Sequence, residues 1–410
     1  MRSLEGAVTE SAVAPEERVP HESYPRLFWR FLRFGLLAWG GPVAQIAMIR
    51  RELVDQDRWV TPGRFNRVYA LYQVLPGPEA HELCVYFGML ARGRLGGLIA
   101  GLAFMLPGFI LMFLLSALYV AQGGSSAVMA AVFYGTQPAI AAAVLRAVHR
   151  IGQPVLKDPW LWMAAVATGL GQVAGVPFFI SLFLSGVAYS AARQNWTALA
   201  LAILAALTAM AIIGILDDAT SGISAEVTGQ GVARETQSPL ELLGSGLRAG
   251  LLTFGGAYTA IPFLQHDAVV RGAWMTNDQF LDGLALSGIL PAPLIIFATF
   301  VGYLGGGAVG AIALTFGVFL PAFGFTLVAH DWLERTVTRP GLHDFLGGVT
   351  AGVVGLIAVT AVVLVRAAIT DATTVAIALA SLAVLYLWHS KLSVLAVVLG
   401  GATVGWMLNV

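Results

Sequence analysis

The stretch Leu75-Pro76-Gly77-Pro78-Glu79-Ala80-His81-Glu82 lies in the middle of an apolar segment, Val68 to Ala91. A segment of about 20 residues is long enough to cross a bilayer. Proline lacks the N–H that a helix needs and biases the preceding residue away from helical angles, so this segment must break at mid-membrane depth. Unpaired backbone groups and carboxylates are costly in lipid. We therefore expect the break to be buried in protein or to line a wet cavity.

The composition of the whole chain is that of a membrane protein. Of its 410 residues, 58% are hydrophobic and only 11% are charged, and the mean hydropathy is +0.79. These values are far from those of a soluble globular protein. The single cysteine, Cys84, excludes an intrachain disulfide and a cysteine-based metal cluster. We predict an all-α polytopic membrane protein without cofactors.

Apolar segments follow one another along most of the chain. They cover residues 28–49, 68–91, 95–120, 126–148, 158–175, 177–191, 196–215, 240–264, 279–303, 306–329, 343–366, 373–388 and 392–409. We interpret residues 1–27 as a cytoplasmic tail, because they lack the apolar core of a signal peptide. The longest polar stretch between segments is Asp217 to Ser238, which carries four acids and one arginine. Such a stretch is typical of a linker on the non-cytoplasmic side.

The sequences on either side of this linker repeat. With an offset of 215, the aligned pairs are Arg33 and Arg248, Gly35 and Gly250, Gly40-Gly41 and Gly255-Gly256, Trp59 and Trp274, and Leu75-Pro76 and Leu290-Pro291. Coincident Gly, Pro and Trp without a gap indicate a duplication. We predict a first repeat at 28–191, an extra helix with the acidic linker at 192–239, and a second repeat at 240–410. Because segment 196–215 has no counterpart, the second repeat is expected to be inverted.

Arginines flank both ends of segments 28–49 and 68–91. The positive-inside rule places all of these arginines in the cytoplasm. That placement requires each segment to enter and leave by the same face, or to cross less simply than a plain helix. We expect re-entrant hairpins or broken helices that turn at Gly40-Gly41-Pro42, at Pro76-Gly77-Pro78, at Gly255-Gly256 and at Pro291-Ala292-Pro293.

Helix breaks at mid-depth predict a site for an anion. A helix N-terminus leaves N–H groups free and carries partial positive charge. Opposed copies of such half-helices are how many secondary transporters hold a substrate at the midplane. Arg33 and Arg248 could add guanidinium forks for an oxyanion, with interfacial snorkelling as the alternative. The predicted substrate-binding residues are Arg33, Gly40, Gly41, Pro42, Gln45, Gln73, Pro76, Gly77, Pro78, Arg248, Gly255, Gly256, Pro291 and Pro293.

Three titratable residues follow the first proline break. Glu79 and His81 are candidates for proton coupling, which requires titration near neutral pH. In the alternative, Glu79 or Glu82 caps the next helical piece, and a metal site of one histidine and two acids would be a poor cage. Gln45 and Gln73 lie near the breaks, where bonding to a helix is the alternative to binding substrate. No ATPase, protease or hydrolase motif is present, so we predict no catalytic residue and no metal.

Several further motifs recur in order along the chain. They are Trp39-Gly40-Gly41-Pro42, Gln45-Ile46-Ala47, Arg51-Glu52-Leu53, Arg58-Trp59-Val60, Leu75-Pro76-Gly77-Pro78-Glu79-Ala80, Gly96-Gly97-Leu98-Ile99-Ala100-Gly101, Leu106-Pro107-Gly108, Phe254-Gly255-Gly256-Ala257-Tyr258, Leu281-Asp282-Gly283-Leu284 and Phe300-Val301-Gly302-Tyr303-Leu304-Gly305. Together they resemble the chromate ion transporter family in its long, two-domain form. The resemblance spans most of residues 28 to 409.

The resemblance implies a bacterial inner-membrane secondary transporter that exports chromate, a tetrahedral divalent oxyanion, and gives chromate resistance. A sulfate-like oxyanion as substrate and an anion channel are the alternatives. A counter-ion, an exchanged proton and a homodimer stay open, and no nucleic acid is implied. We expect a cytoplasmic N-terminus and a periplasmic C-terminus. Departures from the family pattern are Trp39, His81, Glu82 and the more apolar second break, Ser287-Gly288-Ile289-Leu290-Pro291-Ala292-Pro293.

Overall fold

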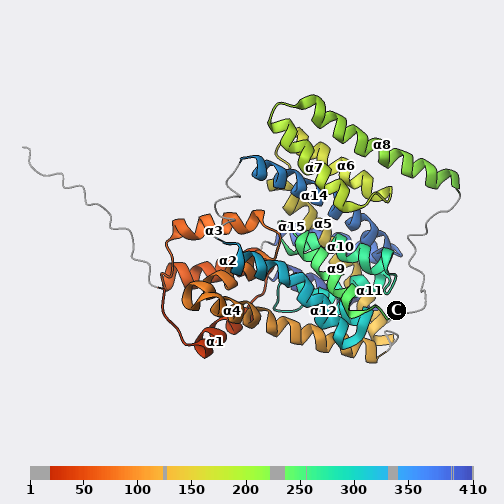
Figure 1. The fold of residues 1–410 in the computed structure, drawn as a ribbon. Coiled ribbons are helices and arrows are strands. Elements are labelled where there is room, and N and C mark those ends of the chain that lie inside the picture. Colours follow the sequence, from red (N-terminus) through yellow and green to blue (C-terminus); the bar gives the residue numbers. More distant parts are fainter. Residues whose placement is uncertain are drawn as a thin grey trace, which may run out of the picture.

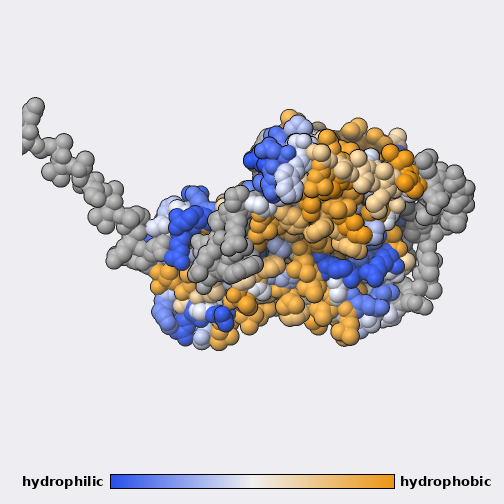
Figure 2. Space-filling model, turned by 45° about the horizontal axis from the view of Figure 1, so that its top comes forward, coloured by the Kyte–Doolittle hydropathy of each residue, from blue (hydrophilic) through white to orange (hydrophobic). Residues whose placement is uncertain are grey.

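The computed structural model describes residues 19–122, 127–221, 236–254, 256–330, 340–388, 390 and 392–408. Within these ranges the chain is helical and contains no strand. Five described helices are long and apolar enough to cross a membrane, namely Glu79–Ala121, Val128–Val155, Thr197–Gly214, Leu294–Val328 and Gly341–Ala368. Figure 2 shows broad hydrophobic areas on the surface, with hydrophilic residues gathered in separate patches. The prediction of an all-α polytopic membrane protein is confirmed.

The helices of the first half are α1 (Tyr24–Leu36), α2 (Gly41–Ile49), the π-helix η1 (Arg50–Gln56), α3 (Pro62–Val74), α4 (Glu79–Ala121), α5 (Ala127–Val155), α6 (Pro159–Val173), α7 (Phe178–Arg193) and α8 (Thr197–Ser221). The second half contains α9 (Pro239–Leu251), the 3-10 helix η2 (Ala257–Ala260), α10 (Ile261–Gln265), the π-helix η3 (His266–Arg271), α11 (Asn277–Gly288), the 3-10 helix η4 (Leu294–Phe297), α12 (Ala298–Val328), α14 (Pro340–Ala368), α15 (Ala372–Leu387) and α16 (Ser393–Leu408). Figure 1 shows their arrangement. Of the predicted tail and linker, residues 1–18 and 222–235 lie outside the described residues.

The backbone repeats between the halves in detail. A kink interrupts α4 where Gly93 has φ 64°, and a matching kink interrupts α12 where Gly307 has φ 60°. Positive φ recurs at Arg58 (54°) and at Ala273 (48°), which the offset of 215 aligns. Each half also carries one π-helix at the same place, directly after the α2 or α10 helix. The duplication seen in the sequence therefore extends to local backbone geometry.

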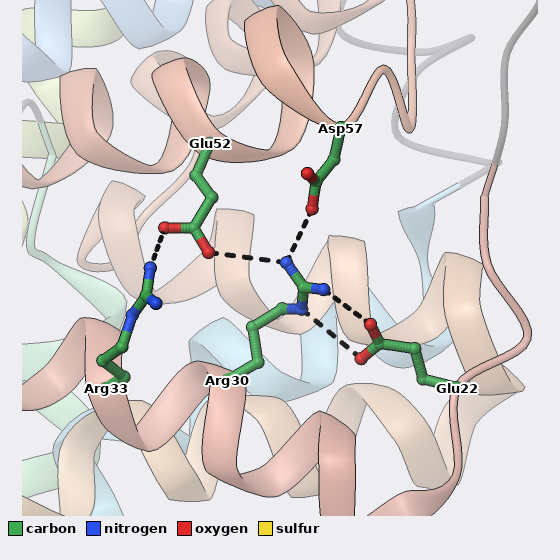
Figure 3. A network of polar contacts seen from close by, with 5 residues as sticks. All are labelled: Glu22, Arg30, Arg33, Glu52 and Asp57. Atoms are coloured by element: carbon green, nitrogen blue, oxygen red, sulfur yellow. Dashed lines mark hydrogen bonds and ion pairs between the residues drawn. The ribbon is translucent and has the colours of Figure 1, made fainter.

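Segment 28–49 folds back on itself. Helix α1 has 13 residues, which at 1.5 Å per residue is only about 20 Å and too short to cross a bilayer. Arg30 donates to Asp57 at 2.6 Å and to Glu22 at 2.7 Å, and Arg33 pairs with Glu52 (Figure 3). These contacts place η1 antiparallel beside α1. The chain thus turns at Gly40-Gly41 and returns to the face from which it entered, as the hairpin version of the prediction requires.

Segment 68–91 also turns back. Helix α3 ends before the proline break and α4 begins after it, and the rings of Tyr72 and Tyr86 face each other across the turn with centroids 6.3 Å apart. At the end of this first part of α4, the Arg92 guanidinium lies 4.4 Å from the ring of Tyr24, at the start of α1. Both hairpins therefore start and finish at one face, where the flanking arginines gather. Past the kink, α4 continues to Ala121.

The two halves are interlocked. Helices α4 and α12 run antiparallel, because Gly97 approaches Leu327 and Gly101 approaches Phe323. Helix α5 packs against α15 and α16 of the other half, and its counterpart α14 packs against α6 and α7. This exchange is the arrangement that inverted repeats would give, and the inversion itself stays a prediction. The extra helix α8 lies at the edge of the molecule against α6 and α7 (Figure 1).

Candidate functional site

A cavity of about 1190 Å³ lies where the breaks of the two halves meet. From the first half it is lined by the hairpin turn at Gly40, Gly41 and Pro42, and by residues on both sides of the proline break. From the second half, residues around the corresponding breaks line it. The break residues that line the cavity are Gly40, Gly41, Pro42, Gln73, Glu79, Gly256, Ser287, Gly288, Leu290, Ala292 and Leu294. Residues at or next to each of the four predicted breaks thus line one space.

The N-terminus of α2 faces this cavity without a side-chain cap. Gly40 adopts the left-handed conformation, with φ 92°, which lets the chain turn into α2. Pro42 has no N–H, and the next residues, Val43 and Ala44, also line the cavity. Because a helix N-terminus presents free N–H groups and partial positive charge, this end of α2 is suited to an anion.

The proline break of the first half is held by the second half. The N–H of Gly77 donates to the carbonyl oxygen of Thr253 at 2.8 Å, just after α9. Pro76, Gly77 and Pro78 are buried and lie behind the cavity wall rather than in it. These residues therefore shape the wall, and the side chains that reach the space come from Gln73 and Glu79 on either side.

Two arginines of α5 enter the cavity, and the sequence analysis did not select them. Arg146 and Arg150 lie one helical turn apart on the same face of α5. Arg146 donates to Ser393 Oγ at 3.4 Å, and within the described chain neither arginine forms an ion pair. The signal available in the sequence was Arg146 itself, a charge inside the apolar segment 126–148, which could not face lipid at acceptable cost.

Arg33 and Arg248 do not line the cavity, and the oxyanion contacts expected for them stay a prediction. Arg33 pairs with Glu52, and the equivalent Arg248 places Nη2 2.7 Å and Nε 3.2 Å from Asp267 Oδ2. Ser245 also donates to Asp267, at 2.7 Å. Each arginine therefore joins the first helix of its hairpin to the π-helix that returns beside it. The carboxylate partners, Glu52 and Asp267, are far from these arginines in the sequence and could not be identified from it.

Of the two predicted glutamines, one lines the cavity and the other does not. Gln45 is buried and donates its amide to the carbonyl oxygen of Ala38 at 2.9 Å, so it closes the turn of the hairpin and does not reach the cavity. Gln73 is exposed and lines the cavity. Pro291 and Pro293 do not line the cavity, whereas Ala292 between them does, and the predicted Gly255 lies outside the described residues.

The three titratable residues after the break have different surroundings. Glu79 lines the cavity and interacts electrostatically with Arg150. His81 is fully buried, with its ring 4.9 Å from Phe319 and 4.6 Å from Phe323, away from the cavity. Glu82 is also fully buried. No side chain caps the start of α4, so the alternative of a capping glutamate is not realised there.

A further buried carboxyl joins three helices of the two halves. Asp282 on α11 accepts a hydrogen bond from the Tyr119 hydroxyl of α4 at 2.8 Å. Its other oxygen accepts one from the Gln137 amide of α5 at 2.9 Å. Both donors are neutral and satisfy the two carboxyl oxygens. Across the described chain, no group of three or more His, Cys, Asp or Glu side chains is placed to hold a metal ion.

Comparisons with known proteins agree on one family. The family described as chromate transporter matches residues 25–216 and 240–406. The chain is 54% identical to the chromate transport protein of Pseudomonas aeruginosa over 393 residues, which cover 95% of this chain and 93% of that protein. It is 30% identical to the chromate transport protein of Cupriavidus metallidurans over 400 residues, 96% of each chain. An uncharacterized transporter of Bacillus subtilis is 32% identical over 154 residues, 37% of this chain and 72% of that protein. No solved structure matches the chain.

Proposed function

The chain belongs to the chromate transporter family, and from this premise we propose that it exports chromate by secondary transport across the bacterial inner membrane and so confers chromate resistance. The N-terminus lies in the cytoplasm and the C-terminus in the periplasm in this proposal. The gathering of hairpin ends and arginines at one face supports the cytoplasmic side for that face. The relatives in Pseudomonas aeruginosa and Cupriavidus metallidurans, both named chromate transport proteins, support chromate as the substrate.

The observation that carries the proposal is the pairing of two kinds of positive charge in one cavity. The uncapped N-terminus of α2 offers backbone N–H groups, and Arg146 and Arg150 offer guanidinium groups that form no ion pair in the described chain, although Glu79 interacts with Arg150 across the cavity. A tetrahedral dianion can accept hydrogen bonds from both sets at once. Small residues at Gly41, Gly256 and Ala292 leave room for its oxygens between the halves.

The membrane potential favours outward movement of this substrate. A charge that crosses the membrane gains about 2.3 kcal/mol per 100 mV, so a dianion leaving an inside-negative cell gains roughly 4–5 kcal/mol per 100 mV. An exchanged proton would add to this driving force. Glu79, which lines the cavity beside the substrate path, is the proposed proton-coupling group there, whereas the buried ring of His81 has no access to the cavity.

The test is chromate uptake into inverted membrane vesicles that contain the full chain, with the potential clamped and sulfate as competitor. We expect saturable uptake that sulfate inhibits weakly. Uptake that sulfate abolishes at equal concentration would identify a sulfate-like anion as the substrate. Macroscopic current that does not saturate with chromate would identify a channel.

Two variants distinguish the loss of an arginine in the cavity from the loss of a positive charge elsewhere. Arg150→Gln removes one guanidinium contact with the dianion, worth about 1.5–3 kcal/mol, and is expected to reduce the apparent chromate affinity about tenfold or more. Arg366→Gln is the matched control, because Arg366 is an exposed arginine near the end of α14 that does not line the cavity. Equal loss in both variants would contradict the cavity as the site.

A further inference from the structure

Glu82 has no polar contact that explains its burial. Its side chain is completely buried, and neither carboxyl oxygen has a hydrogen-bond partner in the described part of the chain. The carboxyl lies directly against the break, since a Cβ placed on Gly77 would be 3.0 Å from both Cδ and Oε1 of Glu82. Burying an ionised carboxylate without a partner costs several kcal/mol. The surroundings therefore favour the neutral, protonated carboxyl.

The groups around Glu82 support the same protonation state. From α12, the residues that pack against this part of α4 are apolar, with Ala322 beside Gly77 and Phe319 and Phe323 against His81. Glu79, one helical turn earlier on α4, is the charged group that acts on Glu82, and it does so by repulsion. The other titratable groups nearby are His81 on α4, Tyr72 on α3 and His330 after α12, where Tyr72 and His330 bond each other at 3.2 Å.

Glu79 and Glu82 connect this buried position to the cavity. They are three residues apart on α4 and so lie on the same side of the helix. Glu79 lines the cavity, where Arg150 acts on it, whereas Glu82 lies behind the break. A shift of the backbone at Gly77 is the movement that would uncover Glu82, because this residue lies between the carboxyl and the other half.

We propose that Glu82 carries the proton of the transport cycle and exchanges it with the cavity through Glu79. The inference rests on the proposed function, and it goes further by giving the coupling proton a second, buried carrier. In the exchange the O–H bond of the Glu82 carboxyl breaks, an O–H bond forms on the Glu79 carboxylate, and Glu79 then passes the proton to water in the cavity. Reprotonation of Glu82 by the reverse path resets the cycle, without any change in redox state.

The test uses the full chain reconstituted into liposomes that contain a pH-sensitive dye, with an imposed chromate gradient. Chromate and proton fluxes are recorded together. The wild-type chain is expected to move protons in exchange for chromate, and Glu82→Gln is expected to lower the number of protons per chromate at least tenfold. Asp282→Asn, the same change at a buried carboxyl that neutral donors already satisfy, is the matched control and is expected to keep the wild-type ratio.

The outcomes separate the two proposals. A wild-type chain without chromate flux overturns the proposed function. Chromate flux without proton movement in the wild-type chain, or an unchanged ratio in Glu82→Gln, overturns the role of Glu82 while leaving chromate transport in place. Infrared difference spectra of the purified proteins give a readout that does not depend on transport. The spectrum of Glu82→Gln is subtracted from that of the wild type. The difference is expected to contain the carbonyl band of a protonated carboxyl, and a difference spectrum without this band contradicts the inference.

Discussion

The two proline breaks have the same position in their repeats and opposite chemical character. In the first half, Pro76-Gly77-Pro78 is followed at once by α4, whose first turn carries Glu79, His81 and Glu82. In the second half, Pro291-Ala292-Pro293 is followed by η4, in which Leu294, Ile295, Ile296 and Phe297 are all buried. The backbone kinks after these breaks are nearly identical. Duplication has preserved the geometry of the break, while the titratable groups are confined to one copy.

This difference indicates a division of labour between the halves. The first break brings the carboxyl group of Glu79 to the cavity and that of Glu82 behind its wall, where we propose proton transfer. The second break closes the other side of the same cavity with apolar and small side chains, of which Ala292 and Leu294 reach the space. A substrate in the cavity would thus lie between a carboxyl group at the first break and apolar side chains at the second break. The comparison can be tested by substituting equivalent residues in the two halves.

The largest effect is expected from Gly77→Ala. Gly77 has φ 151°, and an added Cβ would lie 3.0 Å from the Glu82 carboxyl and 3.2 Å from Ala322. Strain of about 1–3 kcal/mol at a break that must move is expected to lower chromate flux in vesicles more than tenfold. The reciprocal change, Ala292→Gly at the equivalent position, removes only one methyl group and is expected to keep flux within about twofold of wild type. Equal flux in the two variants would show that the breaks are interchangeable.

A smaller effect is expected at the ion pairs that join the two helices of each hairpin. Asp267 is buried and accepts bonds from Arg248 and Ser245, whereas Glu52 is partly exposed in a network that Asp57 and Glu22 share. Asp267→Asn is expected to lower the free energy of unfolding by about 2 kcal/mol, because it leaves a charged donor poorly paired. Glu52→Gln should cost less than about 1 kcal/mol. Denaturant titration in detergent measures both, and a larger loss for Glu52→Gln would contradict this ranking.

A small effect, on stability alone, is expected at the contact between the halves. Tyr119→Phe removes the hydroxyl that donates to Asp282, while Gln137 still bonds the other oxygen. The expected loss is about 1 kcal/mol of unfolding free energy, with chromate affinity unchanged, since neither residue lines the cavity. A change in chromate affinity in vesicles, without a change in stability, would assign Asp282 to the substrate path.

Local signals predicted the architecture well, because each break is encoded where it occurs. Proline and glycine at 76–78 interrupt the helix in any context, and flanking arginines indicate the face at which a hairpin ends. The arginines that line the cavity could not be predicted in that way. Whether an arginine is available to an anion depends on its partner, and the acids that pair with Arg33 and Arg248 lie 19 residues away across each turn. Arg146 and Arg150 form no ion pair in the described chain and line the cavity together with Glu79, an arrangement that only the packing of α5 against the second half makes evident.

The exchange of helices between the halves has a consequence for biosynthesis. When the ribosome has finished the first copy, α5 is complete, but α14, α15 and α16, against which it packs, have not yet been made. Domains generally fold as units during synthesis, N-terminal part first. Here the nascent chain must instead hold α5 in the bilayer without its final neighbours until translation is nearly over. A stop codon in the last helices would therefore leave both copies incomplete, rather than releasing one finished copy and one damaged one.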